Sequence, residues 1–321
     1  MTSPSPHDTR GMIHRIRFSG HDLRRYCIAA IIIILGIVFS PNTDAINPAP
    51  TSPPGAENSS HLTIAFWNIQ WFPGGKPNAS ESAEKRQTLS VQADMKRLNP
   101  DIIGMEEVRN WPMAALAVQP LTGMKVDVCA NFPPREGQNE TQEVAIASRL
   151  QPLSAWVEEW KPAGVATPPR GFAFAAYEPK PHHLLLVYCV HFKSNRGEIA
   201  ENVPIREEAA RQLLSHIETM KRAYSSIGEV SWIIGGDFNT SLDDPRFGSE
   251  NTLRNLLKNN FSWVWQNVPA ASRMTLHGDM NFPPASFDHI FYRGLTLRHA
   301  EVVNTTRQSS DHKPIMAKFE L

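Results

Sequence analysis

Residues 231–240 read SWIIGGDFNT, and this stretch predicts a buried strand that ends in polar side chains. Residues 231–234 carry no charge and are mostly apolar, which is typical of a strand covered on both faces. The next two residues, Gly235 and Gly236, allow a tight turn and the close approach of another group.

Two polar side chains follow the glycines. In an extended chain Asp237 and Asn239 project on the same side, with Phe238 on the other. A carboxylate beside an amide suits a hard cation or the oxygens of a phosphate. The alternative is an Asx turn that closes a loop.

The same arrangement recurs along the chain. Six short apolar runs are each followed by residues that can bind a metal ion or a phosphate. These residues are Asn68, Glu107, His191, Asp237 with Asn239, Asp288, and Asp311 with His312. One such run would be unremarkable, but six on one pattern are hard to attribute to chance.

Hydrophobic periodicity predicts more strands than helices. Further strands are expected at 62–67, 101–105, 124–130, 143–148, 172–177, 183–191, 286–292, 297–303 and 314–319. Helices are expected at 85–98, 206–220 and 252–258. Interspersed helices with polar residues at strand ends predict an α/β or α+β layered sheet protein, with its site along one rim of the sheets.

Length and composition fit an ordinary globular protein. The chain has 321 residues, of which 41% are hydrophobic and 20% are charged, and its formal net charge is zero. Fibrous and fully disordered classes are therefore excluded for most of the chain. No overall basic field indicates nucleic acid, so a polyanion would have to be held by a few basic residues and a metal.

The N-terminus resembles a targeting segment. Four arginines between residues 15 and 25 precede the apolar run 26–39, which as a helix would span about 21 Å of a bilayer core about 30 Å thick. We expect residues 1–45 to be a signal peptide and 46–60 a disordered Pro/Ser-rich spacer. The domain would then be 61–321, secreted or periplasmic. The alternative is an uncleaved anchor with the domain outside the cytoplasm, which is the one case in which the protein would contact a membrane.

Two cysteines remain after the predicted signal, Cys129 and Cys189. An oxidising compartment would permit a disulfide between them. Two buried thiols are favoured instead, because both cysteines lie in runs of core-type residues.

Seven motifs together resemble the endonuclease/exonuclease/phosphatase family, the metal-dependent phosphoesterases that include deoxyribonuclease I. They occur in the family's order and span nearly all of 61–321. The motifs are FWNIQWF (66–72), DIIGMEEV (101–108), VAIASR (144–149), VHFKSN (190–195), IIGGDFNT (233–240), SFDHIF (286–291) and SSDHKP (309–314). The resemblance implies a four-layered α/β sandwich, in which two packed mixed β-sheets are flanked by helices. It also implies a divalent metal, Mg²⁺ or Mn²⁺, with Ca²⁺ as a structural or second ion.

The resemblance also implies a role for each residue that matches a motif. Asn68, Glu107 and Asp311 correspond to the metal site. Asp237 and Asn239 correspond to the pair that handles the attacking water and the phosphate. His191 and His312 would flank the phosphoryl group, with Asp288 orienting His312.

One position departs from the family. Gln142 stands where deoxyribonuclease-like members pair a Glu with the first histidine, and an amide cannot stabilise a histidine cation by charge. Two residues inside the motifs are expected to have no part in the chemistry: Glu106 as a solvated side chain and His289 as a structural one.

Three basic residues are candidate substrate contacts. Arg109 follows Glu107-Val108 as in deoxyribonuclease I, where that Arg enters the minor groove. Arg170 matches a family position that contacts backbone phosphate, and Lys193 follows His191 closely. The alternative for Arg170 is a surface salt bridge, and the alternative for Lys193 is an ordinary loop charge.

These features favour a secreted metal-dependent endonuclease that hydrolyses DNA. The first alternative is a phosphatase or a sphingomyelinase-like phosphodiesterase of the same family, although no long apolar insertion is present to dock on a membrane. The second is a catalytically inactive binding module, which the complete set of polar residues at the strand ends argues against. No stable protein partner is indicated.

Overall fold

Two six-stranded mixed sheets form the centre of the computed structural model, which describes residues 61–133, 142–278, 280 and 283–321. The predicted signal peptide and spacer lie outside the described residues. The first sheet has the strand order β11 (Thr296–Val302), β12 (Ile315–Glu320), β1 (His61–Phe72), β2 (Ile102–Val108), β4 (Glu143–Ser148) and β3 (Lys125–Cys129). The second has the order β5 (Pro152–Glu159), β6 (Gly171–Lys180), β7 (His183–His191), β8 (Glu229–Asp237), β10 (Asp288–Arg293) and β9 (Ser262–Trp263).

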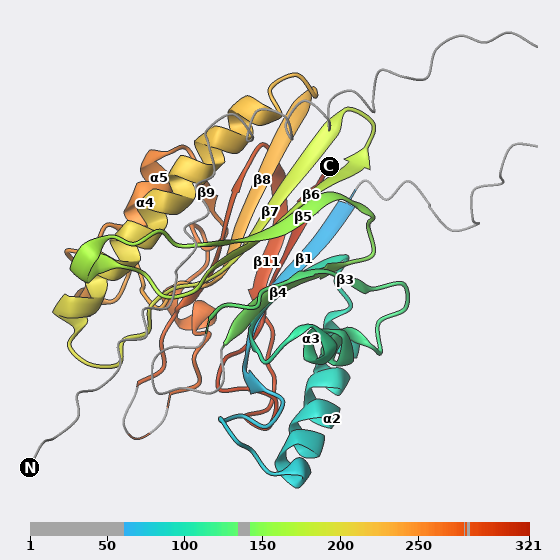
Figure 1. Cartoon of the computed structure of the whole chain (residues 1–321), viewed down its shortest axis with the longest axis vertical. Helices are drawn as coiled ribbons and strands as arrows, with labels where there is room; N and C mark the ends of the chain where they lie inside the picture. The colour runs from blue at the N-terminus through green and yellow to red at the C-terminus, as the bar shows by residue number, and fades with distance from the viewer. Residues whose placement is uncertain (1–60, 134–141, 279, 281–282) are drawn as a thin grey trace, which may run out of the picture. The chain divides into compact units, whose positions relative to one another are not determined.

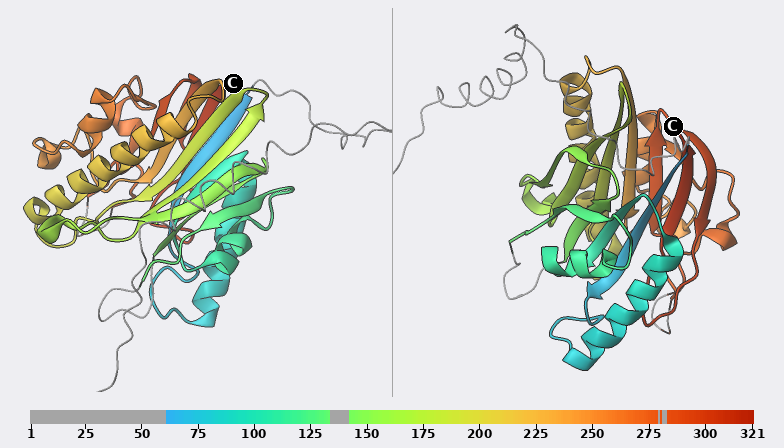
Figure 2. Two further views of the ribbon diagram at one scale, coloured as in Figure 1. Left: turned by 45° about the horizontal axis from the view of Figure 1, so that its top comes forward. Right: turned by 90° about the vertical axis from the view of Figure 1, so that its right-hand side faces the viewer.

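Helices cover the outer faces of both sheets, so the layers follow one another as helix, sheet, sheet and helix (Figures 1 and 2). On the first sheet lie α2 (Glu81–Leu98) and α3 (Trp111–Val118), and on the second α4 (Ile199–Ala223) and α5 (Thr252–Lys258). Three short 3₁₀ turns, η1 (Gly164–Ala166), η2 (Pro245–Phe247) and η3 (Ala270–Arg273), lie in loops. The predicted four-layered α/β sandwich is confirmed.

The main core lies between the two sheets, where apolar side chains from both inner faces interdigitate. Phe66 of β1 points across this layer. A methyl group added at either Gly104 or Gly235 would come within 2.3 Å of the Phe66 ring. The first glycine of the GG pair is therefore needed for packing between sheets. It lies inside β8, not in a turn after the strand as the sequence suggested.

A second apolar cluster lies under α2 and α3, on the outer face of the first sheet. It includes Val91 and Met95 of α2 and Trp67 of β1, all fully buried. Both sheets are thus covered on two sides, which explains the nearly continuous apolar runs of their central strands. None of the helices in the described part of the chain is long and apolar enough to cross a membrane.

The two remaining cysteines are free thiols, as favoured from the sequence. Cys129 is half-buried and its Sγ donates to the carbonyl of Ala130, 3.6 Å away. Cys189 is buried between the sheets, and its Sγ donates to Glu106 Oε1 at 3.0 Å.

Candidate active site

Strand register places three predicted site residues in one row on the second sheet. Asp237 at the end of β8 is the partner of His191 in the parallel strand β7 and of Asp288 in the antiparallel strand β10. Directly paired residues project to the same face of a sheet. The three side chains therefore meet at one rim because of the hydrogen-bond register alone.

Asp288 opens its strand, and His312 lies just before β12 begins at Ile315. The sequence analysis expected both to follow apolar runs at strand ends, which is wrong for these two. The start of an antiparallel strand lies at the same rim as the end of its neighbour. All six positions therefore still reach one edge.

A tight turn follows β8 and joins Asp237 to Asn239. The backbone N–H of Asn239 donates to Asp237 Oδ1 at 2.8 Å, and its side-chain Nδ2 donates to Asp237 Oδ2 at 3.0 Å. Asn239 has a left-handed φ of 53°, so the chain here is not extended. The two side chains meet through an Asx turn, not through the alternation that the sequence suggested.

The first sheet contributes Asn68 and Glu107 through irregular backbone. Glu107 has a φ of 61°, and the pairing of β2 with β4 shifts between Glu106 and Val108. This bulge turns Glu107 toward the rim. Its Oε2 accepts from the backbone N–H of Trp71 at 3.1 Å.

Asn68 joins the two sheets. Its Nδ2 donates to Glu107 Oε1 and to Asp237 Oδ2, each at 3.1 Å. Its Oδ1 accepts from the backbone N–H of Gln70 at 3.0 Å. In this arrangement the amide nitrogen, not the oxygen, faces the two carboxylates, so Asn68 holds the acidic residues in place.

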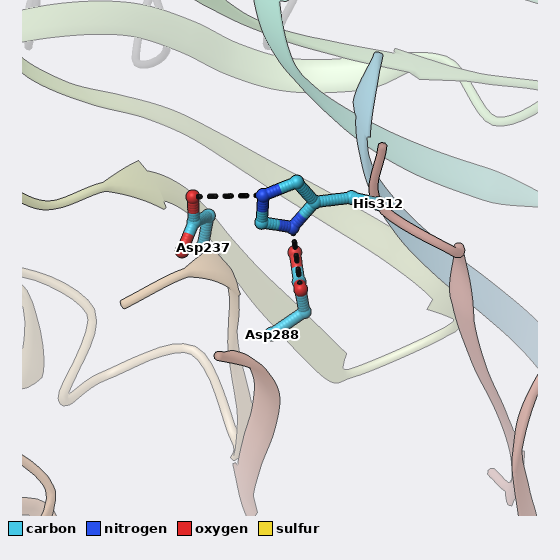
Figure 3. Close-up of side chains that lie close together, drawn as sticks. All are labelled: Asp237, Asp288 and His312. Atoms are coloured by element: carbon cyan, nitrogen blue, oxygen red, sulfur yellow. Dashed lines mark hydrogen bonds and ion pairs between the residues drawn. The ribbon is translucent and has the colours of Figure 1, made fainter. Parts of the chain in front are cut away.

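His312 lies between two carboxylates (Figure 3). Its Nδ1 is 2.8 Å from Asp288 Oδ2, which confirms the contact predicted between these residues, and its Nε2 is 3.9 Å from Asp237 Oδ2. The indole Nε1 of Trp67 donates to the His312 carbonyl at 3.0 Å and fixes this segment to β1. His191 Nε2 approaches the same carboxylate from its own strand, at 3.6 Å.

Burial and mutual repulsion change the acidity of these groups. Burial raises the pKa of Asp237 to about 7; the nearby His312 opposes this rise and Asp288 adds to it. Burial and the charge of Asp311 raise the pKa of Glu107. Burial alone would lower the pKa of His312, but the charges of Asp288 and Asp237 outweigh it and hold that pKa well above its usual value. The two carboxylates therefore favour the protonated form of His312.

Glu106 was expected to be solvated, and this is wrong. Its side chain is fully buried and points between the sheets, where Cys189 donates to it. Burial raises its pKa well above the usual value and so favours its neutral form. The cause is strand alternation, which the bulge at Glu107 interrupts one residue later. His289 is buried with both ring nitrogens paired, to Thr240 and Trp263, which fits its structural interpretation.

The site opens into a cleft of about 380 Å³. Of the predicted substrate contacts, Arg170 and Lys193 line it and Arg109 does not. Arg170 donates to the carbonyls of His191 and Phe192 and to Gln142 Oε1. Arg109 instead forms an ion pair with Glu84, 2.6 Å apart.

Several lining residues were not predicted. Ser194 and Asn195 extend the polar wall, and Trp71, Phe132, Leu276 and Phe287 form apolar parts of it. Trp71 and Asn195 lie inside motifs already recognised, so their proximity to the site could have been foreseen. Phe132 and Leu276 come from loops whose path the sequence does not specify.

The residues present fit a divalent metal ion. Three carboxylates, those of Glu107, Asp237 and Asp311, line one small cleft, and the carboxylate of Asp288 is hydrogen-bonded to His312 Nδ1 beside it. Atoms of Asp237, Asp288 and His312 lie within 4.8 Å of one another, but the Asp288–His312 hydrogen bond already uses two of them. Oxygen-rich sets of this kind suit hard cations. Burial is the main cause of the raised pKa values of Asp237 and Glu107, and a cation would also offset the charge of the neighbouring carboxylates that adds to the rise. Asp288 has a histidine at hydrogen-bond distance, whereas the nearest histidine nitrogens lie 3.6 Å from Asp237 and 3.8 Å from Glu107.

Comparisons with known proteins agree with this geometry. The model of the endonuclease/exonuclease/phosphatase family matches residues 65–312. Among curated proteins, no sequence matches. A protein of this family from Bacteroides vulgatus has a similar structure, with 16% identity and a TM-score of 0.61, over 81% of this chain and 99% of that one.

Two further structures share the fold. The human Nocturnin catalytic domain with bound sulfate is 14% identical, with a TM-score of 0.60 over 81% of this chain and 93% of that one. D. rerio TDP2 complexed with single-strand DNA product is 16% identical, with a TM-score of 0.58 over 82% and 100%. Enzymes of the matching family are hydrolases of phosphoester bonds and typically depend on a divalent metal. With the family's model matched from residue 65 to residue 312, the chain belongs to the endonuclease/exonuclease/phosphatase family.

Proposed function

We propose that the protein is a divalent-metal-dependent phosphodiesterase that hydrolyses nucleic acid, with DNA as its main substrate. The observation that carries this proposal is one cleft that combines buried carboxylates, a cationic histidine and basic walls. Asp237 and His312 supply a base and an acid in the same site, while Arg170 and Lys193 line its side. A negatively charged phosphodiester needs this combination, because its charge repels the attacking oxygen.

Asp237 is the group suited to handle the attacking water. Its pKa of about 7 leaves a large fraction of the carboxylate ionised at neutral pH, which suits a general base. Hydrogen bonds from Asn239 and Asn68 fix its orientation. A carboxylate held in this way can orient a water for in-line attack on phosphorus.

His312 is the group suited to stabilise negative charge on the phosphoryl group. Its Nδ1 is held by Asp288, so Nε2 is directed toward the cleft side of the site. A preorganised cationic donor stabilises charge that develops in the transition state. His191 lies on β7, on the other side of Asp237 from Asp288. It would assist through its position beside Asp237, because Gln142 cannot stabilise a His191 cation by charge.

Glu107 and Asp311 would hold the metal, with Asn68 bracing Glu107. When bound, Mg²⁺ or Mn²⁺ offsets the charge of the phosphate and polarises a phosphoryl oxygen.

Nucleic acid is favoured over a small phosphoester by the walls of the cleft. Basic groups line it together with Trp71 and Phe132, and a basic groove with aromatic side chains is typical of binding to single-stranded nucleic acid. D. rerio TDP2, which shares the fold, carries a single-strand DNA product in its structure. Arg109 does not support the proposal, since its charge is paired with Glu84.

Hydrolysis of a panel of substrates by the purified protein tests this proposal. Supercoiled plasmid, single-stranded DNA, RNA, sphingomyelin and an inositol phosphate would be compared with Mg²⁺ present. We expect the DNA substrates to be cleaved fastest and Asp237→Asn to abolish the reaction. Preferential release of phosphocholine or inorganic phosphate would show a phospholipid or phosphatase activity instead, and no turnover of any substrate would favour a binding module.

We also propose that the protein works outside the cytoplasm after removal of residues 1–45. The support is the short apolar run after a basic segment in the sequence. The intact mass of the protein from an exporting host is expected to match a chain that begins near residue 46. A mass that retains residues 26–39, in the membrane fraction, would favour an anchor.

A further inference from the structure

Arg206 of α4 is a fully buried cation close to the cleft. Its Nε donates to Glu250 Oε1 at 2.8 Å and its Nη2 to Glu250 Oε2 at 2.6 Å. Glu250 is itself only 3% exposed. A buried ion pair is a weak source of net stability, because both charges lose their hydration. We therefore expect the Arg206–Glu250 ion pair to have a role other than stabilising the fold.

The remaining nitrogen of Arg206 holds the loop that follows β7. Nη1 donates to the carbonyl of Lys193 at 3.2 Å and to Asn195 Oδ1 at 2.9 Å. Both residues line the cleft. The rigid fork of one guanidinium therefore fixes two points of a cleft wall against α4.

The Asn195 side chain connects Arg206 to Asn239 through a second hydrogen bond. Its Nδ2 donates to the backbone carbonyl of Asn239 at 2.7 Å. The side chain of Asn239 in turn donates to the carbonyl of Phe192, in the same loop, at 3.3 Å. The loop thus holds Asn239 by both its backbone and its side chain.

Asn239 needs this support because of its conformation. A left-handed φ of 53° is less favourable than the right-handed region even for Asn, which tolerates it better than most residues, so contacts that hold it contribute to its order. The Asn239 side chain and backbone N–H both donate to Asp237. A shift of Asn239 would therefore also release Asp237.

We propose that Arg206 is a positioning residue for the reaction, acting through Asn195 on Asn239 and so on Asp237. It touches no reacting atom. It locks the loop at residues 192–196 to α4, and the loop locks the turn that carries the two catalytic side chains. The inference rests on the proposed phosphodiesterase function, which assigns catalytic roles to Asp237 and Asn239.

Arg206→Lys and Asn195→Ala test this proposal, with Arg211→Lys as the matched control. Arg211 lies on the same helix and forks onto Glu208 in the same way, but its side chain is 66% exposed. Lysine keeps the charge and loses the fork. We expect kcat on DNA to fall roughly 10-fold to 100-fold in both test variants, as for a small misplacement of catalytic groups. KM should change little, and Arg211→Lys should match the wild type.

The link through Asn239 has its own test. If Asn195 acts through Asn239, Asn195→Ala with Asn239→Ala should lose little more activity than Asn239→Ala alone. Independent kinetic losses in the double variant would overturn the link.

Amide hydrogen exchange supplies a readout that needs no activity. Asn195→Ala should speed exchange at residues 237–240, while exchange in the central strands stays at wild-type rates. If Arg206→Lys fails to fold, Asn195→Ala still decides, because it leaves the ion pair with Glu250 in place. Unchanged exchange and unchanged kcat in Asn195→Ala, with an active wild type, would overturn this inference alone. An inactive wild type would instead contradict the proposed function. The exchange rates of Asn195→Ala would still show whether Asn195 holds residues 237–240 in place.

Discussion

Glu106 and Glu107 are neighbours in the chain with opposite surroundings. Glu106 points between the sheets and Glu107 to the rim, because a bulge interrupts β2 between Glu106 and Val108. Glu107→Gln keeps the size of the side chain but removes the charge proposed to hold a metal. We expect it to weaken Mg²⁺ binding and to reduce kcat strongly, whereas Glu106→Gln should leave both near wild type, since that side chain points between the sheets toward Cys189 and does not line the cleft.

The two substitutions are a matched pair for measuring rate against Mg²⁺ concentration. Near wild-type turnover of Glu107→Gln at low Mg²⁺ would show that the metal site lies elsewhere. A large loss in Glu106→Gln would mean that its carboxyl acts as a charge.

His312 and Asp288 should act as one unit. Removing a preorganised donor of this kind typically lowers kcat about 10²–10³-fold, or about 3–4 kcal/mol. His312→Ala should therefore lose kcat with KM nearly unchanged. Asp288→Asn combined with His312→Ala should cost little more than His312→Ala alone, because Asp288 orients the ring through Nδ1.

Melting temperatures of His312→Ala, Asp288→Asn and the double variant separate this catalytic role from a packing role. A histidine that only fills space would lower thermal stability and leave kcat per folded molecule intact. Additive kinetic losses would likewise speak against the unit.

Residue identities at the site were largely predictable, but their orientations were not. The motifs named Asp237, His312 and Asp288 correctly as neighbours. The burial of Glu106 depends on the bulge, and the direction of the Asn68 amide depends on the backbone N–H of Gln70. Irregular backbone sets both features, and the pattern of apolar and polar residues does not show where the backbone is irregular.

At the scale of elements, β8 depends on its two glycines for different reasons. A methyl group at Gly236 would come within 2.1 Å of the Val190 carbonyl and 2.9 Å of Glu106 Oε1. Gly236→Ala should destabilise the protein by more than the roughly 1–2 kcal/mol of a left-handed alanine. Gly123→Ala is the control, since Gly123 has a φ of 77° and open space around it. Urea denaturation of both variants measures the difference, and equal losses would show that the contact with Val190 is easily relieved.

Most of the apolar runs were predicted as elements, but β5 and α3 were not. Hydrophobic periodicity predicts both ends of β7 and both ends of α5 correctly. Strand β5 was not predicted, because its residues are only half-buried and its strand form depends on pairing with β6. Helix α3 was also missed, although the Asn110 cap and the proline in its first turn are start signals that could have revealed it.

At the scale of the whole molecule, the acidic cleft links stability to pH and metal. The folded-state pKa of Asp237, about 7, lies above its ordinary value of 3.8, and that of Glu107 is also raised. For a raised pKa, the stabilisation is full below the unfolded value and is lost as pH rises through the folded value. Without divalent metal, the protein should therefore lose stability between about pH 4 and about pH 7 from this source.

Mg²⁺ should reverse that loss, because metal binds the deprotonated carboxylates. We expect Mg²⁺ to raise the melting temperature much more at about pH 8 than at about pH 5. Differential scanning fluorimetry with Mg²⁺ or with EDTA checks this, and Glu107→Gln should show a smaller Mg²⁺ effect. An equal shift at both pH values would indicate binding that does not involve these carboxylates.

The pairing of the two sheets was beyond the reach of sequence pattern without the family resemblance. Periodicity gives strands and their polar ends, but it does not say that β1 and β8 face each other. The contact of Asn68 with Asp237 across that interface completes the site. Packing over long sequence separations, such as Phe66 against Gly235, decides that arrangement.

The nicking rate of supercoiled plasmid by the purified protein is the most direct measurement of the central claim. It would be recorded with Mg²⁺, with Mn²⁺ and with EDTA, for the wild type and for Asp237→Asn. We predict nicking by the wild type with either metal, none with EDTA, and loss of nicking in Asp237→Asn with the fold preserved by circular dichroism. Nicking that persists in EDTA, or in Asp237→Asn, would contradict a metal-dependent phosphodiesterase site in this cleft.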